Sequence, residues 1–389
     1  MPKLSIRDLD LRDKRVFIRV DFNVPLAPGG QEITSDKRIR ASLPTIQYAL
    51  AQGAKLVLAS HLGRPKGKPN PEMSLKPVAA RLEELLGAPV VMAPDCIGPE
   101  VERLKAAGQP VLLLENLRFH PEEEKNDAAF AKELAQGIDY YVNDAFGTAH
   151  RAHASTVGII QFVPKAAAGL LMEKELEYLT KVTENPPLPC VGILGGAKVS
   201  DKIEVIENLL KIVDRLLIGG AMAYTFMRAQ GKPTGKSLVE EDKIPLAKEV
   251  LAKAGAKLVL PVDHVVTAEI KAGAPFEVVE TIPDGMIGVD IGPATIALFE
   301  NEIARAKTII WNGPMGVFEK PPFDAGTVAL AKTVAASGAL SVVGGGDSEK
   351  AIKAAGVASR ISHISTGGGA SLEFLSGIEL PGVAALTDK

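Results

Sequence analysis

The chain contains few of the residues on which small secreted proteins and membrane proteins depend. It has two cysteines among its 389 residues, Cys96 and Cys190, and aromatic residues make up 5% of the sequence. Two cysteines cannot build a disulfide framework, which is typical of a reducing compartment. The longest stretches without a charged side chain cover residues 41–54 and 333–346, whereas a membrane-spanning helix needs about 18 apolar residues. We therefore expect a cytoplasmic protein with no membrane partner.

A strong excess of either charge is also missing. The net charge is −3 at pH 7, with a slight positive excess in residues 1–169 and a slight negative excess in the remainder. That balance is too small for a general nucleic-acid surface, so we expect no nucleic-acid partner. Most arginines lie at or before Arg151. This fits a local set of forked cationic donors for a small anion, although a chance distribution explains the composition equally well.

Short apolar runs rich in Val, Ile and Leu alternate with amphipathic segments along the chain. Runs without polar alternation are typical of strands that are covered on both faces. We expect strands over residues 15–20, 55–59, 90–92, 111–114, 140–142, 190–194, 215–218, 257–260, 308–311, 340–343 and 361–364. We expect helices over residues 38–52, 75–86, 128–136, 201–212, 242–254 and 327–337. The alternation predicts an α/β protein with two doubly wound, Rossmann-like domains of parallel sheet.

The boundary between the two domains is predicted by a proline-rich segment. Residues 185–189 read Asn-Pro-Pro-Leu-Pro, where a helix cannot continue. The preceding residues, 166–183, predict one helix that connects the domains. We therefore expect a first domain over residues 1–169, a connecting helix over 170–185 and a second domain over 186–372.

Arginines and hydrogen-bonding groups follow the predicted strands of the first half. Ligands of open parallel sheets bind beyond the carboxyl ends of the strands. Those ends carry Asp21-Phe-Asn23, His61-Leu-Gly-Arg64, Arg118 and Arg151. Bidentate arginines are the natural clamp for phosphate and carboxylate. One such arginine would more often belong to a solvated rim, but the repetition at successive strand ends favours an anion site.

Glycine clusters follow the predicted strands of the second half. They occupy residues 195–196, 219–220, 313–316, 344–346 and 367–369. Glycine lets the backbone approach a phosphate and leaves N–H groups free to point at it, and a helix beginning at Ser200 or Ser348 would add its positive end. Asp347 is a candidate Mg²⁺ ligand, because Mg²⁺ takes one or two carboxylates beside phosphate oxygens. The alternative is that these glycines serve tight turns alone.

Several other sequence patterns do not predict a binding site. Residues 231–237 resemble a Walker A loop but have three residues between the glycines, where four are required. The dinucleotide fingerprint Gly-x-Gly-x-x-Gly is missing. His150 and His153 could form a metal pair, but no third ligand motif accompanies them. Neither Cys96 nor Cys190 has a partnered histidine signature, so we expect both to be small buried hydrophobes.

A first domain that binds a small anion and a second that binds a nucleotide with Mg²⁺ together predict phosphoryl transfer. That reaction depends on positioning and on neutralising charge, with little covalent work for the protein. Further cations are then needed around the transferred group. Arg38, at the start of a predicted helix, and Lys202, one helical turn after Lys198, are the candidates.

At these residues the chain resembles the phosphoglycerate kinase family. The matching motifs occur in family order and include Arg19-Val-Asp-Phe-Asn-Val-Pro25, residues 143–153, Trp311-Asn-Gly-Pro-Met-Gly-Val-Phe-Glu319 and residues 344–348. The resemblance extends from about residue 5 to residues 380–384. It implies transfer of the ATP γ-phosphoryl group to the carboxylate of 3-phosphoglycerate, giving ADP and 1,3-bisphosphoglycerate. It also implies a monomer whose C-terminal tail, near residues 373–389, returns to the first domain.

The resemblance also implies a role for each matching residue. The catalytic residues would be Arg38, Lys198 and Lys202, and the metal ligand Asp347. The phosphoglycerate would lie against Asp21, Phe22, Asn23, Arg38, His61, Leu62, Gly63, Arg64, Arg118 and Arg151. The nucleotide would lie against Gly195, Ala197, Lys198, Lys202, Gly219, Gly220, Asn312, Gly313, Pro314, Val317, Glu319, Gly344, Gly345, Gly346, Asp347 and Ser348. A nucleotide-sensing binding protein and another carboxylate kinase remain the alternatives.

Overall fold

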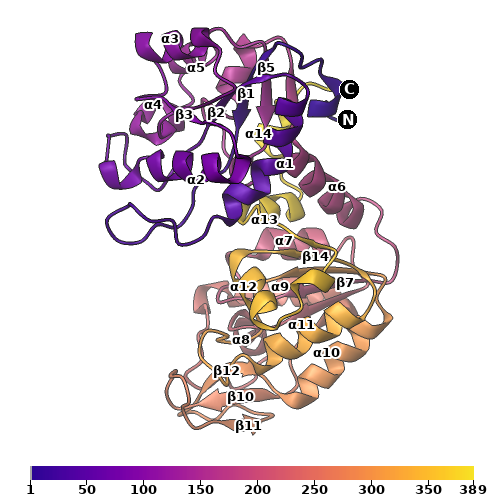
Figure 1. The fold of residues 1–389 in the computed structure, drawn as a ribbon. Helices are drawn as coiled ribbons and strands as arrows, with labels where there is room; N and C mark the ends of the chain where they lie inside the picture. The colour runs from indigo at the N-terminus through magenta and orange to yellow at the C-terminus, as the bar shows by residue number, and fades with distance from the viewer. Residues whose placement is uncertain (1) are drawn as a thin grey trace. The chain divides into compact units, whose positions relative to one another are not determined.

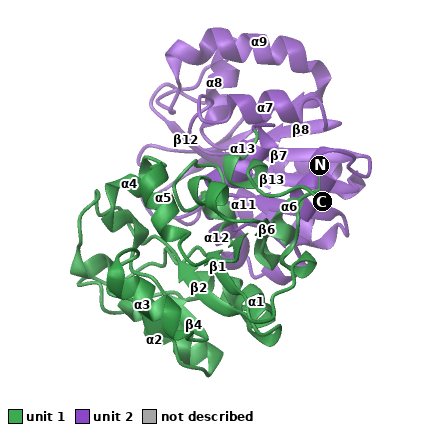
Figure 2. Ribbon diagram, turned by 90° about the horizontal axis from the view of Figure 1, so that it is seen from above, with its two compact units in different colours: residues 1–176, 379–389 green, residues 177–378 purple. Residues whose placement is uncertain are grey.

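The computed structural model describes residues 2–389 and divides into two compact units, which Figure 2 colours separately. Unit 1 comprises residues 1–176 and 379–389, and unit 2 comprises residues 177–378. The boundary falls inside helix α6, Leu170–Thr183, which overlaps the connecting helix that the sequence predicts. The return of the chain to unit 1 begins at Glu379, later than the residue 373 expected.

Unit 1 is built on a six-stranded parallel sheet with the order β3-β4-β2-β1-β5-β6 (Figure 1). Its strands are β1 Arg15–Arg19, β2 Lys55–Ala59, β3 Val91–Met92, β4 Val111–Leu113, β5 Tyr140–Asn143 and β6 Ala166–Ala168. Its helices, besides the start of α6, are α1 Lys37–Ala51, α2 Lys76–Leu86, α3 Pro99–Ala107, α4 Pro121–Glu124, α5 Ala128–Leu134 and α14 Pro381–Ala384. Short 3₁₀ helices are η1 Ile6–Asp8, η2 Pro71–Met73, η3 Leu117–Phe119, η4 Phe146–Thr148 and η5 Gly158–Phe162.

Unit 2 contains a second six-stranded parallel sheet, with the order β15-β14-β13-β7-β8-β9. Its strands are β7 Cys190–Leu194, β8 Arg215–Ile218, β9 Leu258–Val259, β13 Thr308–Asn312, β14 Leu340–Gly344 and β15 His363–Ile364. A three-stranded antiparallel sheet contains β10 His264–Thr267, β11 Glu277–Val279 and β12 Ile287–Ile291. The helices are α7 Ile203–Leu209, α8 Met222–Ala229, α9 Ile244–Ala254, α10 Pro293–Arg305, α11 Ala325–Ala336, α12 Gly346–Ala354 and α13 Gly369–Leu375, with 3₁₀ helices η6 Glu241–Lys243, η7 Gly255–Lys257 and η8 Ala358–Arg360.

Both six-stranded sheets confirm the predicted fold class. The central strands β1, β4, β7 and β13 are buried along almost their whole length, which is why their sequences are continuous apolar runs. Because neighbouring strands are parallel, their carboxyl ends meet at one edge of each sheet. The residues after β4, β2, β1 and β5 therefore gather in unit 1, and those after β14, β13, β7 and β8 gather in unit 2.

Two sequence-based expectations about secondary structure are wrong, and one sheet was not predicted. Residues 166–168 form the edge strand β6, which pairs with β5, and α6 begins only at Leu170. Their three alanines favour helix by intrinsic propensity, and pairing with β5 overrides it. The segment 200–202 is a turn and α7 begins at Ile203. The antiparallel sheet of β10, β11 and β12 was not predicted, because β11 is largely exposed and has no buried apolar run.

No helix within residues 2–389 is both long enough and apolar enough to cross a membrane.

Asp144 joins the end of β5 to the start of α6 in unit 1. Its Oδ1 accepts hydrogen bonds from the backbone N–H of Leu171 at 2.9 Å and of Met172 at 3.4 Å, whereas its buried Oδ2 has no partner. A side chain at Gly169 would lie 2.1 Å from Oδ1, so this close approach requires glycine. Burial raises the pKa of Asp144 to about 7.

We expect Asp144→Asn to flatten the pH dependence of stability. The carboxyl stays protonated in the folded chain up to about pH 7, whereas its ordinary pKa is 3.8. The folded state therefore binds the extra proton, and stability falls as pH rises from about 4 to 7, by up to about 1.4 kcal/mol per pH unit. Urea unfolding across this range should show a smaller decline for the variant. Asp127→Asn, at the exposed N-cap of α5, should keep the wild-type decline. A decline that is equal in wild type and Asp144→Asn would contradict the assignment.

Candidate functional site

In unit 1, the ends of β1 and α1 bring opposite charges together. Asp21 follows β1, and its carboxylate forms an ion pair with Arg38 in the first turn of α1. The Arg38 side chain is 42% exposed, so its guanidinium keeps donors available to a ligand. Asn23 Oδ1 accepts a hydrogen bond from the backbone N–H of Gly63 at 2.9 Å, which ties the loop after β1 to the loop after β2.

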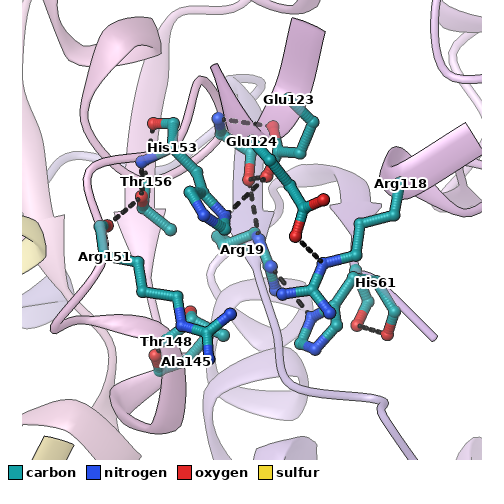
Figure 3. Close-up of polar contacts among 12 residues, drawn as sticks. Arg19, His61, Arg118, Glu123, Glu124, Ala145, Thr148, Arg151, His153 and Thr156 are labelled. Carbon is teal, nitrogen blue, oxygen red and sulfur yellow. Dashed lines mark hydrogen bonds and ion pairs between the residues drawn. The ribbon is translucent and has the colours of Figure 1, made fainter. Parts of the chain in front are cut away.

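Arg19 holds the ring of His61 (Figure 3). Arg19 is fully buried at the end of β1, and its Nη2 lies 3.1 Å from His61 Nδ1. A guanidinium is only a donor, so Nδ1 accepts and the ring proton lies on Nε2. Burial, followed by the charges of Arg19 and Arg118, places the pKa of His61 well below its ordinary value. His61 is therefore a neutral donor through Nε2.

Glu123 is the buried counter-charge of Arg19. Arg19 Nε donates to Ser155 Oγ at 2.8 Å, and the same hydroxyl donates to Glu123 Oε1 at 2.5 Å. Burial raises the pKa of Glu123, and Arg19 and Ser155 oppose that rise. The sequence analysis assigned roles to neither Arg19 nor Glu123. The arginine inside the apolar run of residues 15–20 was the signal that could have revealed the pair, since a buried charge requires a partner.

Arg118 and Arg151 add two further guanidinium groups. Arg118 lies in η3 and is 6% exposed; its Nη1 donates to the carbonyl of Gly63 at 2.9 Å, and its Nε lies 3.3 Å from Glu124 Oε1. Arg151 is half-buried, and its Nε donates to His150 Nε2 at 3.2 Å. Both are drawn in Figure 3.

Guanidinium groups outnumber the carboxylates that pair with them, which are Asp21, Glu123 and Glu124. Burial and the neighbouring arginines lower the pKa of His153 to about 4, and the same causes lower the pKa of His150. Both histidines are therefore neutral at pH 7, while the guanidinium groups stay charged. A half-buried group of arginines that outnumber their carboxylate partners is a site for a small anion with several oxygens. Arg64, also predicted for this site, is exposed after β2.

Two residues predicted for the anion site have other roles. Phe22 and Leu62 are buried in the core of unit 1. The backbone N–H of Phe22 donates to Ser60 Oγ at 2.8 Å, and that of Leu62 donates to Asn116 Oδ1 at 3.1 Å. Their backbone carbonyls also accept hydrogen bonds within the chain. Both residues therefore position their neighbours and leave no polar group for a ligand.

In unit 2, the glycines at the strand ends pack the loops against one another. The N–H groups of Gly195, Gly219 and Gly220 donate to the carbonyls of Asn312, Leu194 and Met315. A Cβ at Gly195 would lie 2.0 Å from the carbonyl oxygen of Pro314, and one at Gly313 would lie 2.2 Å from that of Gly195. The expectation that these N–H groups are free for phosphates is wrong, because close contact between loops consumes them.

The N-terminus of α12 is one source of free backbone donors among the predicted glycine clusters. The first N–H groups of a helix lack partners within it, and α12 begins at Gly346. Ser348 is buried in the first turn, and its Oγ accepts from the N–H of Gly313 at 2.6 Å. That hydrogen bond fixes the loop after β13 against α12. The positive end of the helix then favours an anion there.

Lys202 lies beside the same loop. Its Nζ donates to Oδ1 of Asn312, which is buried at the end of β13. Burial lowers the pKa of Lys202 to about 8, while Asp201 and Asp347 oppose the shift. Lys202 is therefore a cation below about pH 8 whose charge nearby phosphates would stabilise. Lys198, its predicted companion, is exposed in the loop after β7.

Asp347 is suited to hold Mg²⁺ together with phosphate oxygens. Its side chain lies in the first turn of α12, is 58% exposed, and pairs with Lys350 at 3.0 Å. One accessible carboxylate at a helix end that favours phosphate matches the donor set of Mg²⁺. Of the other residues predicted for the nucleotide, Ala197, Gly346 and Glu319 are exposed, Pro314, Val317 and Gly345 are half-buried, and Gly344 is buried.

The comparisons with known proteins agree over almost the whole chain. A family model described as phosphoglycerate kinase matches residues 6–378. A phosphoglycerate kinase of Solibacter usitatus is 74% identical, over 99% of this chain and all of the relative, and one of Koribacter versatilis is 62% identical over the full length of both chains. The solved structure of phosphoglycerate kinase from Coxiella burnetii aligns with a TM-score of 0.90 at 43% identity, covering 99% of this chain and 98% of its own. That from Pyrococcus horikoshii aligns with a TM-score of 0.85 at 37% identity, covering 98% of each chain.

Proposed function

We infer the details of the reaction from one premise, which is that this chain belongs to the phosphoglycerate kinase family. The chain is a kinase that transfers a phosphoryl group reversibly between ATP and 3-phosphoglycerate. The observation that best supports the residue roles below is the group of arginines in unit 1, which outnumber the carboxylates Asp21, Glu123 and Glu124 that pair with them. A substrate that carries both a phosphate and a carboxylate gives this group a purpose.

We propose that the acid is held entirely by unit 1. Its phosphate lies against the guanidinium groups of Arg64, Arg118 and Arg151, with His61 donating through Nε2. Asp21 and Asn23 orient the rest of the molecule. Arg38 bridges the acid's carboxylate and the transferred phosphoryl group, a role that suits its half-exposed guanidinium beside Asp21.

We propose that the nucleotide is held by unit 2. Lys198 and Lys202 contact its phosphates or the group in transfer, the α12 N-terminus binds phosphate oxygens, and Asp347 holds Mg²⁺. Bound there, Mg²⁺ would neutralise part of the phosphate charge. Glu319 binds the ribose. The nucleoside lies nearer to the loops with Gly219, Gly220, Asn312 and Pro314, and the other predicted nucleotide residues of these loops line the same site.

The reaction we propose is direct in-line transfer. An oxygen of the acid's carboxylate forms a bond to the γ-phosphorus, and the bond from that phosphorus to the β,γ-bridging oxygen breaks, with ADP leaving with the electron pair. A general base is not required, because a carboxylate is ionised at pH 7. Arg38 and Lys202 stabilise the charge on the transferred oxygens.

The acyl phosphate product must be kept from water. We propose that the two units close during turnover and reopen to release products, with α6 and residues 367–370 as hinges. We also propose that the chain works as a monomer in the cytoplasm.

A coupled assay with ATP and 3-phosphoglycerate tests this function. We expect ADP formation that depends on both substrates and on Mg²⁺, and little turnover with acetate or with glycerate, which lack the phosphate. Tight nucleotide binding without turnover would indicate the nucleotide-sensing alternative. Faster turnover with an acid that lacks a phosphate would indicate another carboxylate kinase.

Asp347→Ala should weaken Mg²⁺–nucleotide binding by about 10- to 100-fold, a loss typical of damage around a metal site. Binding of 3-phosphoglycerate should stay nearly unchanged, because we place it on unit 1. Calorimetry with each ligand measures both effects. Lys350→Ala is the matched control, because it removes the same surface ion pair and keeps the carboxylate. The opposite pattern of losses would mean that the ligands are assigned to the wrong units.

A further inference from the structure

One cluster of metal-ligating side chains in unit 1 is separate from the residues assigned to the acid. Among residues 2–389, Asp95, Cys96 and His120 form the group of three whose ligand atoms all lie within 4.8 Å of one another. The sequence analysis expected Cys96 to be an inert buried residue. The link to His120 was not predicted, because His120 lies 24 positions along the chain and reaches Cys96 only through the fold.

The sheet brings these residues together. Asp95 and Cys96 follow β3, and His120 ends η3, which follows the adjacent strand β4. Backbone hydrogen bonds fix both segments, including one from the N–H of Glu115 to the carbonyl of Asp95 at 3.3 Å. The His120 ring stacks on Phe130 with 5.2 Å between ring centroids, which limits its rotation.

The distances between the ligand atoms are close to those of a metal site. Asp95 Oδ1 lies 2.6 Å from His120 Nε2 and 3.6 Å from Cys96 Sγ. Around a tetrahedral zinc ion with bonds of about 2.0–2.3 Å, ligand atoms lie about 3.3–3.8 Å apart. The sulfur–oxygen pair already has this separation. The carboxylate and the ring need to move apart by roughly 1 Å, which rotation of the Asp95 side chain can supply.

Access and charge also favour a cation. Cys96 is fully buried, whereas the side chains of His120 and Asp95 are 24% and 47% exposed, so an ion can enter past the carboxylate and meet the sulfur last. Glu122 and Glu133 both act on His120 through their negative charge. Lys105 interacts electrostatically with Cys96. Its ammonium donates hydrogen bonds to Glu102 and to two backbone carbonyls, which offset its positive charge.

We propose that Asp95, Cys96 and His120 form a binding site for a zinc-class divalent cation, with water as the fourth ligand. A cysteine, an imidazole and a carboxylate are zinc ligands, and the sulfur disfavours Mg²⁺ and Ca²⁺. The ion bonds to Sγ, and the thiol proton is released to solvent. His120 binds through Nε2 as a neutral ring whose remaining proton is on Nδ1, so the Nε2 proton that is now donated to Asp95 is released to solvent. The hydrogen bond to Asp95 is replaced by two bonds to the metal.

Cobalt titration of the full-length chain, reduced, metal-free and without nucleotide, tests the site. We expect one equivalent of Co²⁺ to give thiolate-to-cobalt charge-transfer absorption and the intense visible bands of tetrahedral cobalt, and Zn²⁺ to abolish both. Cys96→Ser should lose the charge-transfer band, and His120→Gln should lower the affinity at least about tenfold. Cys190→Ser removes the second buried cysteine, which lies in unit 2, and should keep the full signal.

Three results would overturn the proposal. They are the absence of a charge-transfer band in the wild type, its persistence in Cys96→Ser, and its loss in Cys190→Ser. X-ray absorption at the zinc edge of the wild-type chain decides the matter without any variant. We expect one sulfur scatterer among nitrogen and oxygen, and a shell without sulfur means that Cys96 is not a ligand. None of these measurements depends on the kinase reaction.

Discussion

Replacing Arg38 by alanine should lower kcat by about 10³- to 10⁵-fold, the effect of removing an arginine that stabilises a phosphoryl group in transfer. We expect this effect because the Arg38 guanidinium is half-exposed and pairs with Asp21. Its remaining N–H donors can therefore bind the oxygens on which negative charge develops during the reaction. The KM for 3-phosphoglycerate should rise much less, since Arg64, Arg118 and Arg151 still hold its phosphate. Steady-state kinetics in both directions separates the two parameters.

Two variants make the Arg38 result specific. Arg40→Ala removes an exposed arginine from the same helix, where it pairs with Asp36, and should keep near-wild-type kcat. Arg38→Lys keeps the charge but loses the forked geometry, and should recover only part of the rate. If Arg38→Ala turns over within tenfold of wild type, Arg38 has no role in the transfer step.

Lys202→Met should lower kcat by about 10²- to 10³-fold, the cost of one preorganised donor at a transition-state oxygen. Methionine keeps the length of the side chain and its packing and removes the charge. Lys253→Met, which breaks a surface ion pair with Glu207 in the same unit, is the control and should behave as wild type. Equal rates for Lys202→Met and wild type would exclude Lys202 from catalysis.

The pH profile provides a second measure of the same residue. Because the pKa of Lys202 is lowered to about 8, the free enzyme loses this cation as pH rises through that value. The wild-type kcat/KM should therefore fall above about pH 8, since kcat/KM reports the free enzyme. In Lys202→Arg, whose guanidinium stays charged, the fall should shift to higher pH.

The strands were the part of the fold that the sequence predicted best. Strands covered on both faces need continuous apolar runs, and β2, β7 and β8 begin and end where those runs do. The misses have local causes. Ala166–Ala168 has helical propensity but is held as a strand by pairing with β5 and by hydrogen bonds to Leu4 and Thr387. Strand β11 lies at a partly exposed edge. Pairing partners of this kind are not encoded in the segment itself.

The candidate site was predicted at the level of residue type and strand end. The order of the parallel strands then determined which strand ends meet. The sequence did not indicate which polar groups the protein uses internally. The N–H groups of Gly195 and Gly220 are consumed by neighbouring loops, and Phe22 and Leu62 are core residues. The Arg19–Glu123 network and the cluster at Cys96 were missed because their members meet only in three dimensions.

Unit 1 is completed by residues 379–389, at the C-terminal end of the chain. The N–H of Leu4 donates to the carbonyl of Thr387 at 2.8 Å, the N–H of Thr387 donates to that of Ala166 at 3.0 Å, and Lys3 pairs with Asp388. Unit 2, by contrast, is one uninterrupted segment. During synthesis the ribosome therefore makes all of unit 2 before it makes the residues that complete unit 1. The unit that is translated first is finished last, against the usual N-to-C order of domain folding.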